Sequence, residues 1–117
     1  MKFSVVVAII DQASEDKAID IAKANGAGGV TQMKGVGMGL NEKKTFFGLT
    51  YERPEAILVF VLERRTSVNV MKALKSELDL ENSAKGLIFT LPIEHLAGIP
   101  AKQLSAFSNR LKEENEI

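Results

Sequence analysis

Two stretches of the chain are apolar at almost every position. Residues 3–10 and 56–62 consist almost entirely of β-branched and other hydrophobic side chains. A strand has this composition when it lies at the centre of a sheet and is covered on both faces. Two further strands are predicted, a short one at about 29–34 with Val30, Gln32 and Lys34, and an apolar one at 87–91 that is ended by Pro92.

Segments with helical periodicity follow the two strongest strands. Residues 14–25 predict a helix with Ser14 as its N-cap and a stop at Asn25 and Gly26. A second helix is predicted to begin with Ser67 as its N-cap. Its apolar face is formed by Val70, Met71, Leu74 and Leu78. Each helix thus has one face for a core and one for solvent.

The last segment of the chain also has a helical period. Pro100 is suited to the first turn of a helix. The apolar positions that follow it are Leu104, Phe107 and Leu111. Residues 100–117 are therefore predicted to form a C-terminal helix that packs against the sheet or against another protomer.

The order of these elements predicts the fold class. Strand, helix and strand are followed by a long loop and then by a second strand, helix and strand. This is the split βαβ, or ferredoxin-like, arrangement (βαββαβ), an α+β fold with an antiparallel sheet and both helices on one face. Residues 1–99 are predicted to form this domain and residues 100–117 its C-terminal helical extension. Because two helices cannot cover both sheet faces, the C-terminal helix or another subunit must cover the second face.

A glycine-rich segment separates the two halves of this fold. Gly35, Gly37 and Gly39 alternate with larger residues, and a polar stretch follows at 41–44. Residues 36–53 are therefore predicted to form a long loop, and a loop of this length in a compact domain is often functional. The alternating glycines either hold an anion with successive N–H groups or only turn the chain out of a strand.

Composition excludes several classes of function. Among 117 residues, 15 basic and 15 acidic side chains cancel, so no overall field draws the chain to nucleic acid or to an anionic membrane. The absence of cysteine and the presence of a single histidine exclude disulfides, thiol nucleophiles and histidine-rich metal sites within one chain. The first apolar run has no cleavage site and is too short to span a bilayer. We therefore expect a cytoplasmic protein without direct membrane insertion.

Four cations are candidates for binding a phosphate group. Lys85, in a turn beside Gly86, is the strongest of them, and the others are Lys34, Arg64 and Arg65. Each is also explained as an ordinary solvated charge. The sequence alone therefore leaves both interpretations open.

Catalysis has little support in the sequence. His95 has no acidic neighbour except Glu94, and no Ser-His-Asp arrangement or paired catalytic carboxylates are evident. His95 is more simply a surface or cleft histidine. We therefore expect that the chain is not an enzyme.

The loop also contains aromatic residues. Phe46 and Phe47 are adjacent on an otherwise polar segment, so at least one ring is exposed unless another molecule covers it. We expect a partner protein or a neighbouring subunit to provide this cover. Tyr51 is expected to pack its ring against one of these phenylalanines.

The segment Lys34-Gly35-Val36-Gly37, between a strand and a long loop, resembles the start of the T-loop in nitrogen-regulatory P-II signalling proteins. Farther along, Gly48-Leu49-Thr50-Tyr51 resembles the Gly-x-x-Tyr of that loop. Lys85-Gly86-Leu87-Ile88-Phe89 resembles the B-loop and the strand that close the family's nucleotide site. The resemblance covers residues 2–99.

The resemblance implies a homotrimer with regulatory function and no cofactor. An effector, an adenine nucleotide (ATP, ADP or AMP) or another small anion, would bind between subunits. The implied binding residues are Lys34, Gly35, Val36, Gly37, Arg64, Lys85 and Gly86. The T-loop would bind a target such as a membrane transporter or a metabolic enzyme through Phe46, Phe47 and Tyr51. Tyr51 occupies the position that some relatives nucleotidylate.

Two features of the family have no counterpart in this sequence. Met38-Gly39-Leu40 replaces a glutamine that follows the Lys-Gly-x-Gly segment, and residues 94–99 lack the family's Arg-x-Arg pair. We therefore expect a divergent branch with altered ligand preference. The alternative is a ferredoxin-like module of another kind, an amino-acid or anion sensor without a nucleotide response.

Overall fold

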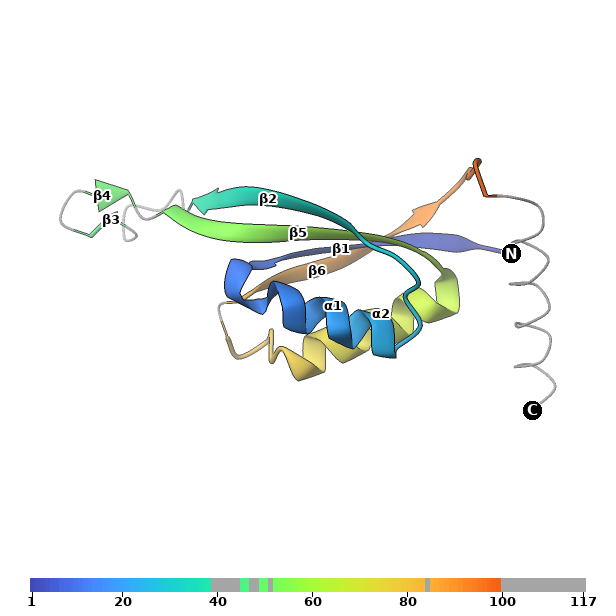
Figure 1. Ribbon diagram of the computed structural model, residues 1–117, viewed down its shortest axis with the longest axis horizontal. Coiled ribbons are helices and arrows are strands. Elements are labelled where there is room, and N and C mark those ends of the chain that lie inside the picture. Colours follow the sequence, from blue (N-terminus) through green and yellow to red (C-terminus); the bar gives the residue numbers. More distant parts are fainter. Residues whose placement is uncertain (39–44, 47–48, 51, 84, 100–117) are drawn as a thin grey trace.

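The computed structural model describes residues 1–38, 45–46, 49–50, 52–83 and 85–99. They form a layer of strands and a layer of two helices (Figure 1). In chain order, the elements are β1 (Phe3–Asp11), a 3-10 turn (Gln12–Ser14), α1 (Glu15–Ala24), β2 (Thr31–Met38), β3 (Thr45–Phe46), β4 (Leu49–Thr50), β5 (Glu52–Glu63), α2 (Arg64–Glu77) and β6 (Gly86–Ile93). The predicted C-terminal helix at 100–117, with Leu104, Phe107 and Leu111, lies outside the described residues.

The main sheet has four antiparallel strands in the order β2-β5-β1-β6. The two most apolar strands, β1 and β5, form its inner pair, with Val7 opposite Val59. β6 pairs with the free side of β1, and β2 pairs with the free side of β5. The βαββαβ order and the ferredoxin-like fold class are therefore confirmed, with β3 and β4 as an additional small hairpin.

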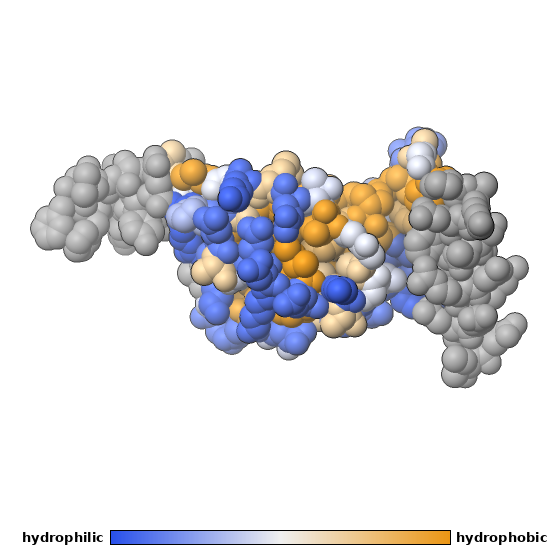
Figure 2. Space-filling model, in the orientation of Figure 1, coloured by the Kyte–Doolittle hydropathy of each residue, from blue (hydrophilic) through white to orange (hydrophobic). Residues whose placement is uncertain are grey.

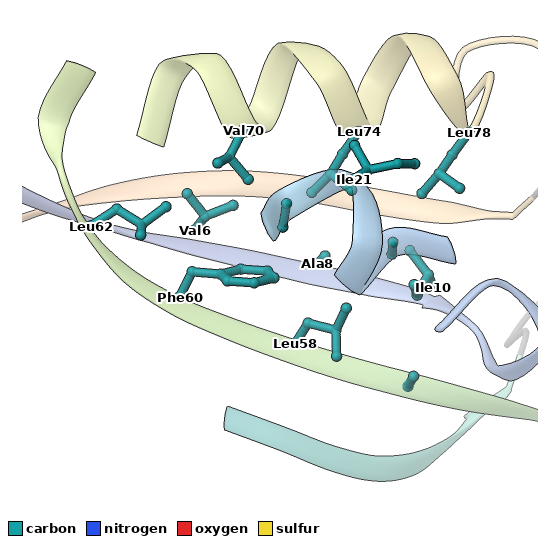
Figure 3. Packing of buried hydrophobic residues seen from close by; sticks show 13 residues of the cluster. Val6, Ala8, Ile10, Ile21, Leu58, Phe60, Leu62, Val70, Leu74 and Leu78 are labelled. Carbon is teal, nitrogen blue, oxygen red and sulfur yellow. The ribbon is translucent and has the colours of Figure 1, made fainter. Parts of the chain in front are cut away.

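The core lies between the sheet and the two helices. Successive side chains of a strand point to opposite faces, so alternate residues of β1 and β5 face the helices and are buried. Figure 3 shows how these side chains meet those of α1 and α2. The core residues are Val6, Ala8, Ile10, Ala18, Ile21, Ala22, Ala56, Leu58, Phe60, Leu62, Val70, Leu74 and Leu78.

The other sheet face, called the open face below, is also apolar. It carries cross-strand rows such as Leu91, Val5 and Val61, in which Val5 pairs directly with the other two. Its large side chains are 37–55% exposed at Met33, Val61, Leu87, Phe89 and Leu91. Figure 2 shows apolar atoms along the strand layer and hydrophilic atoms over much of the helix layer. Within one chain, the two helices thus cover one face of the sheet. Among the described residues, nothing covers the second face.

The start of α2 differs from the prediction. The helix begins at Arg64, and the carboxylate of Glu63 is its N-cap, accepting hydrogen bonds from the N–H groups of Arg65 (3.0 Å) and Thr66 (3.3 Å). Ser67 is not the cap: it is buried and donates its hydroxyl to the carbonyl of Arg64 at 2.6 Å. The prediction was wrong because β5 passes into α2 without a linker, so a strand residue supplies the cap.

The other helix and the last strand also differ in detail. Ser14 stands at the N-cap position of α1 but makes no side-chain cap hydrogen bond, since a 3-10 turn precedes it. The predicted stop is confirmed, with Gly26 at a φ of 106°. β6 continues through Pro92 to Ile93 rather than ending at the proline. An edge strand accommodates a residue that has no N–H group.

The predicted loop at 36–53 is wrong at both of its ends. β2 continues to Met38 and β5 begins at Glu52, so Gly35 and Gly37 lie inside a paired strand. The glycines make room for side chains of β5: a Cβ on Gly35 would lie 3.1 Å from Cδ1 of Ile57, and one on Gly37 would collide with Glu55. Strand pairing therefore explains these glycines, and their N–H groups do not form an anion nest in this conformation.

Gly86 gives a direct test of the β1–β6 pairing. A Cβ at this position would collide with the carbonyl oxygen of Ile9 and lie 2.7 Å from Cα of Ile10. We expect Gly86→Ala to lower the free energy of unfolding by about 1–3 kcal/mol, as overpacking does. Gly28→Ala is the matched control, because nothing lies within 4 Å of its Cβ. Equal urea midpoints for the two variants would contradict this pairing.

Candidate effector-binding site

The structure brings two of the three segments with the family resemblance, those that begin at Lys34 and at Lys85, to the same end of the sheet. Gly35 of β2 pairs with Glu55 of β5, and Glu55 pairs with Asp11 of β1. The N–H of Asp11 donates to the carbonyl of Lys85 at 2.7 Å. Gly35, Glu55, Asp11 and Lys85 therefore form one row across four chain segments, called the sheet-end row below. It lies where β2 and β5 lead toward β3 and β4 (Figure 1).

The candidate residues of β2 lie on different faces of the sheet. Gly35 and Gly37 share the open face with Glu55, whereas Lys34 pairs with the core residue Ala56. Directly paired residues point to the same side of a sheet, so Lys34 leaves it on the helix side, as does Val36. Both side chains are exposed. The structure therefore places the two glycines, but not Lys34, on the open face of the row.

Lys85 and Gly86 lie at the opposite end of the row from β2. Lys85 is exposed and immediately precedes β6. Gly86 brings the backbone of β6 against Ile9 and Ile10, with no room for a side chain. A ligand lying across β5 and β1 could therefore contact Lys85 at one end and the glycines of β2 at the other.

Arg64 is not part of this row within one chain. It follows the far end of β5, about 25 Å along the strand from Glu55. Its N–H donates to the carbonyl of Lys2 at 2.9 Å. There it lines a cavity of about 950 Å³ together with Lys2, Phe3, Glu94 and apolar residues of the segment up to Ile99. The candidate cations thus divide between the two ends of the sheet.

Two charged residues of the row were missed by sequence reasoning. Asp11 is the last residue of β1, and Glu55 lies near the start of β5. Their side by side placement follows from strand register, for which the local sequence carries no signal. An acidic residue at the end of each of two apolar strands was the only available indication.

The residues expected to contact a partner are only partly described. Phe46 belongs to β3, where it pairs with Leu49 of β4. Phe47 and Tyr51 lie outside the described residues, so their contacts stay predictions. The β3–β4 hairpin lies beyond the ends of β2 and β5, at the far left of Figure 1.

His95 has the surface position expected for it. Its Nε2 lies 3.6 Å from a carboxylate oxygen of Glu94, and both side chains are 90% exposed. Among the described residues, no group of three or more His, Asp or Glu side chains could hold a metal ion. None of the described helices is long and apolar enough to cross a bilayer.

Comparison with solved structures identifies the fold. The chain resembles B. subtilis GlnK, with a TM-score of 0.66 and 18% identity over 86% of this chain and 93% of that one. It also resembles the B. subtilis GlnK–ATP complex, with a TM-score of 0.64 and 18% identity over 79% and 82% of the two chains. The fold of this chain is therefore that of the PII signalling proteins.

A PII-like protein from another organism has the same fold. CPII from Thiomonas intermedia K12, a nitrogen regulatory PII-like protein bound to ADP, AMP and bicarbonate, matches with a TM-score of 0.62 and 13% identity over 85% of this chain and 98% of that one. No protein-family model and no curated protein sequence matches the chain. The likeness is thus one of three-dimensional structure, reached at low sequence identity.

Proposed function

We propose that the chain is a divergent PII-like signalling protein that binds a small effector and regulates another protein. The segment between Met38 and Glu52, which connects β2 to β5, is called the arm below. The observation that carries this proposal is the sheet-end row, which connects the strands next to the arm to Lys85. The PII fold and the family resemblance of both segments support the same assignment. The proposed function is regulatory rather than enzymatic.

The protein assembles as a homotrimer through the open face. Exposed apolar side chains on this face include Leu91 and Val61, and their cross-strand neighbour Val5 continues the row. A group of neighbouring exposed apolar side chains on one surface commonly marks a protein–protein interface. Packing against other copies removes the open face from water, so that both faces of each sheet are buried.

The effector is an adenine nucleotide or another small anion. The sheet-end row lies on the open face, so a second subunit placed on that face would enclose it. Lys85 supplies a positive charge there, and Arg64 of a neighbouring copy would be a second source. ATP in the GlnK complex and ADP and AMP in CPII make adenine nucleotides the first ligands to test.

Effector binding changes the arm beyond Met38 and Glu52, which binds the target. This is switching by the ordering of a segment, and its size is limited by the difference in effector affinity between the two states. The target is a membrane transporter or a metabolic enzyme of the cytoplasm, in nitrogen metabolism. Phe46, Phe47 and Tyr51 are the arm residues that would contact it.

Thermal melting tests effector binding. A nucleotide present at about 100 times its dissociation constant should stabilise the protein by about 2.7 kcal/mol. We expect Lys85→Ala to weaken the apparent affinity for the nucleotide about tenfold and so to reduce the melting shift. Lys72 is an exposed lysine on α2, and Lys72→Ala should leave the shift unchanged. The absence of a shift with millimolar ATP, ADP and AMP would refute nucleotide sensing.

A second candidate is a ferredoxin-like binding module without a nucleotide response. A B. cereus protein related to NIF3 matches the chain with a TM-score of 0.63 and 13% identity over 80% of this chain, but only 26% of that one. The same fold therefore also occurs as part of a larger, differently named protein. A melting shift with an amino acid or a small inorganic anion, and none with nucleotides, would favour this alternative.

A further inference from the structure

The sheet-end row contains two carboxylates, which lie between Lys85 and the glycines of β2, where an effector would bind. Asp11 and Glu55 are direct cross-strand partners on the open face, between the glycines of β2 and Lys85. Like charges placed opposite one another in a sheet repel. A ligand that spans the row must therefore approach both of these negative charges.

The side chain of Glu55 lies directly against Gly37. A Cβ on Gly37 would collide with Oε1 and Cδ of Glu55 and lie 2.9 Å from Oε2. The carboxylate thus occupies the space that a side chain at residue 37 would fill. The surface that a glycine would offer to an anion is here covered by a negative charge.

Asp11 adds a second requirement. Its Oδ1 atom is buried and has no hydrogen-bond partner among the described residues. Because Oδ1 lies below the surface, Asp11 acts on a ligand at the row through its negative charge rather than by direct contact. This charge opposes the oxygens of a phosphate chain and favours a ligand with few negative charges.

Within one chain, the basic residues near the row do not outnumber these acids. Arg53 pairs with Gly37 on the open face, and Lys85 lies at the other end of the row. One chain therefore supplies two basic and two acidic residues here. The segment 94–99, where the family has its arginine pair, contributes none.

We propose that Asp11 and Glu55 make the effector site selective for ligands of low negative charge, such as a nucleoside monophosphate, over nucleoside diphosphates and triphosphates. The inference rests on the proposed function, because it concerns the same site. Each added phosphate group brings negative charge close to carboxylates that are partly removed from water, where charge interactions are stronger than in bulk solvent. The arrangement thus discriminates by repulsion rather than by an added contact.

Isothermal titration calorimetry with AMP, ADP and ATP tests this selectivity. Divalent cations are omitted, because they would neutralise the phosphates. For the unmodified protein we expect affinity to fall in the order AMP, ADP, ATP. Glu55→Gln should raise the affinity for ATP about tenfold, equivalent to about 1.4 kcal/mol, and change that for AMP less than about threefold. Asp11→Asn should act in the same direction.

Asp20→Asn is the charge-matched control. It also removes one carboxylate, but from the exposed side of α1 in the helix layer. If Glu55→Gln and Asp11→Asn raise ATP affinity no more than this control does, or if the unmodified protein binds ATP as tightly as AMP, the selectivity inference is overturned and the proposed function is retained. If neither the unmodified protein nor the Glu55→Gln variant binds any nucleotide, nucleotide sensing and the selectivity both fall.

Discussion

Val61→Glu is expected to convert the assembled protein into monomers. Val61 lies on the open face, 49% exposed in the single chain, in the same cross-strand row as Val5 and Leu91. In the proposed trimer this position is buried, and an unpaired carboxylate there costs several kcal/mol, whereas in a monomer it is solvated. Light scattering after size-exclusion chromatography should show a mass about threefold lower, close to the 12.8 kDa of one chain.

Val68→Glu is the matched control for this prediction. Val68 is 44% exposed, but it lies on α2 in the helix layer. The same chemical change at a similar exposure should leave the assembly intact. An unmodified protein that is already monomeric, or equal masses for the two variants, would contradict the interface on the open face. The effector site between subunits would then have no basis.

The parts of the fold that sequence predicts well are those set by side-chain composition. β1 and β5 are apolar on both faces, and they are the two inner strands of the sheet. The stop of α1 was also predictable, since Gly26 adopts a positive φ that other residues rarely adopt. These features depend on local properties of the chain.

The parts that sequence missed depend on a partner strand or on the adjoining element. Gly35 and Gly37 suggested the start of a loop, but they accommodate Ile57 and Glu55 of β5 within a paired strand. The cap of α2 comes from Glu63, the last residue of β5, because the strand passes directly into the helix. Neither relation is visible without strand register or element boundaries.

The same distinction applies to the candidate site. Lys85 and the glycines of β2 could be selected by resemblance, and the register brings them into one row. Lys34 is adjacent to those glycines in sequence but lies on the other sheet face, because neighbouring strand residues alternate in direction. Asp11 and Glu55, which set the charge of the row, became evident only when β1 and β5 were paired.

Leu74→Ala is expected to destabilise the two-layer core strongly. Leu74 is fully buried on α2 and packs against the sheet in the core of Figure 3. Removing a buried leucine side chain costs about 2–5 kcal/mol, because transfer free energy is lost and a cavity remains. With an m-value of about 1–3 kcal/mol per molar urea, the unfolding midpoint should fall by at least about 0.7 M.

Leu96→Ala is the same change at a residue that is 40% exposed, and it should cost less than about 1 kcal/mol. Both substitutions are best measured in the Val61→Glu background, because assembly otherwise adds a concentration-dependent term to stability. A large difference between the two leucines in that background means that the two-layer core holds the domain together without its neighbours. If the two substitutions instead lower the free energy of unfolding equally in that background, Leu74 contributes no more to the monomer than an exposed residue does. The core would then form only in the assembled protein, together with the effector cleft.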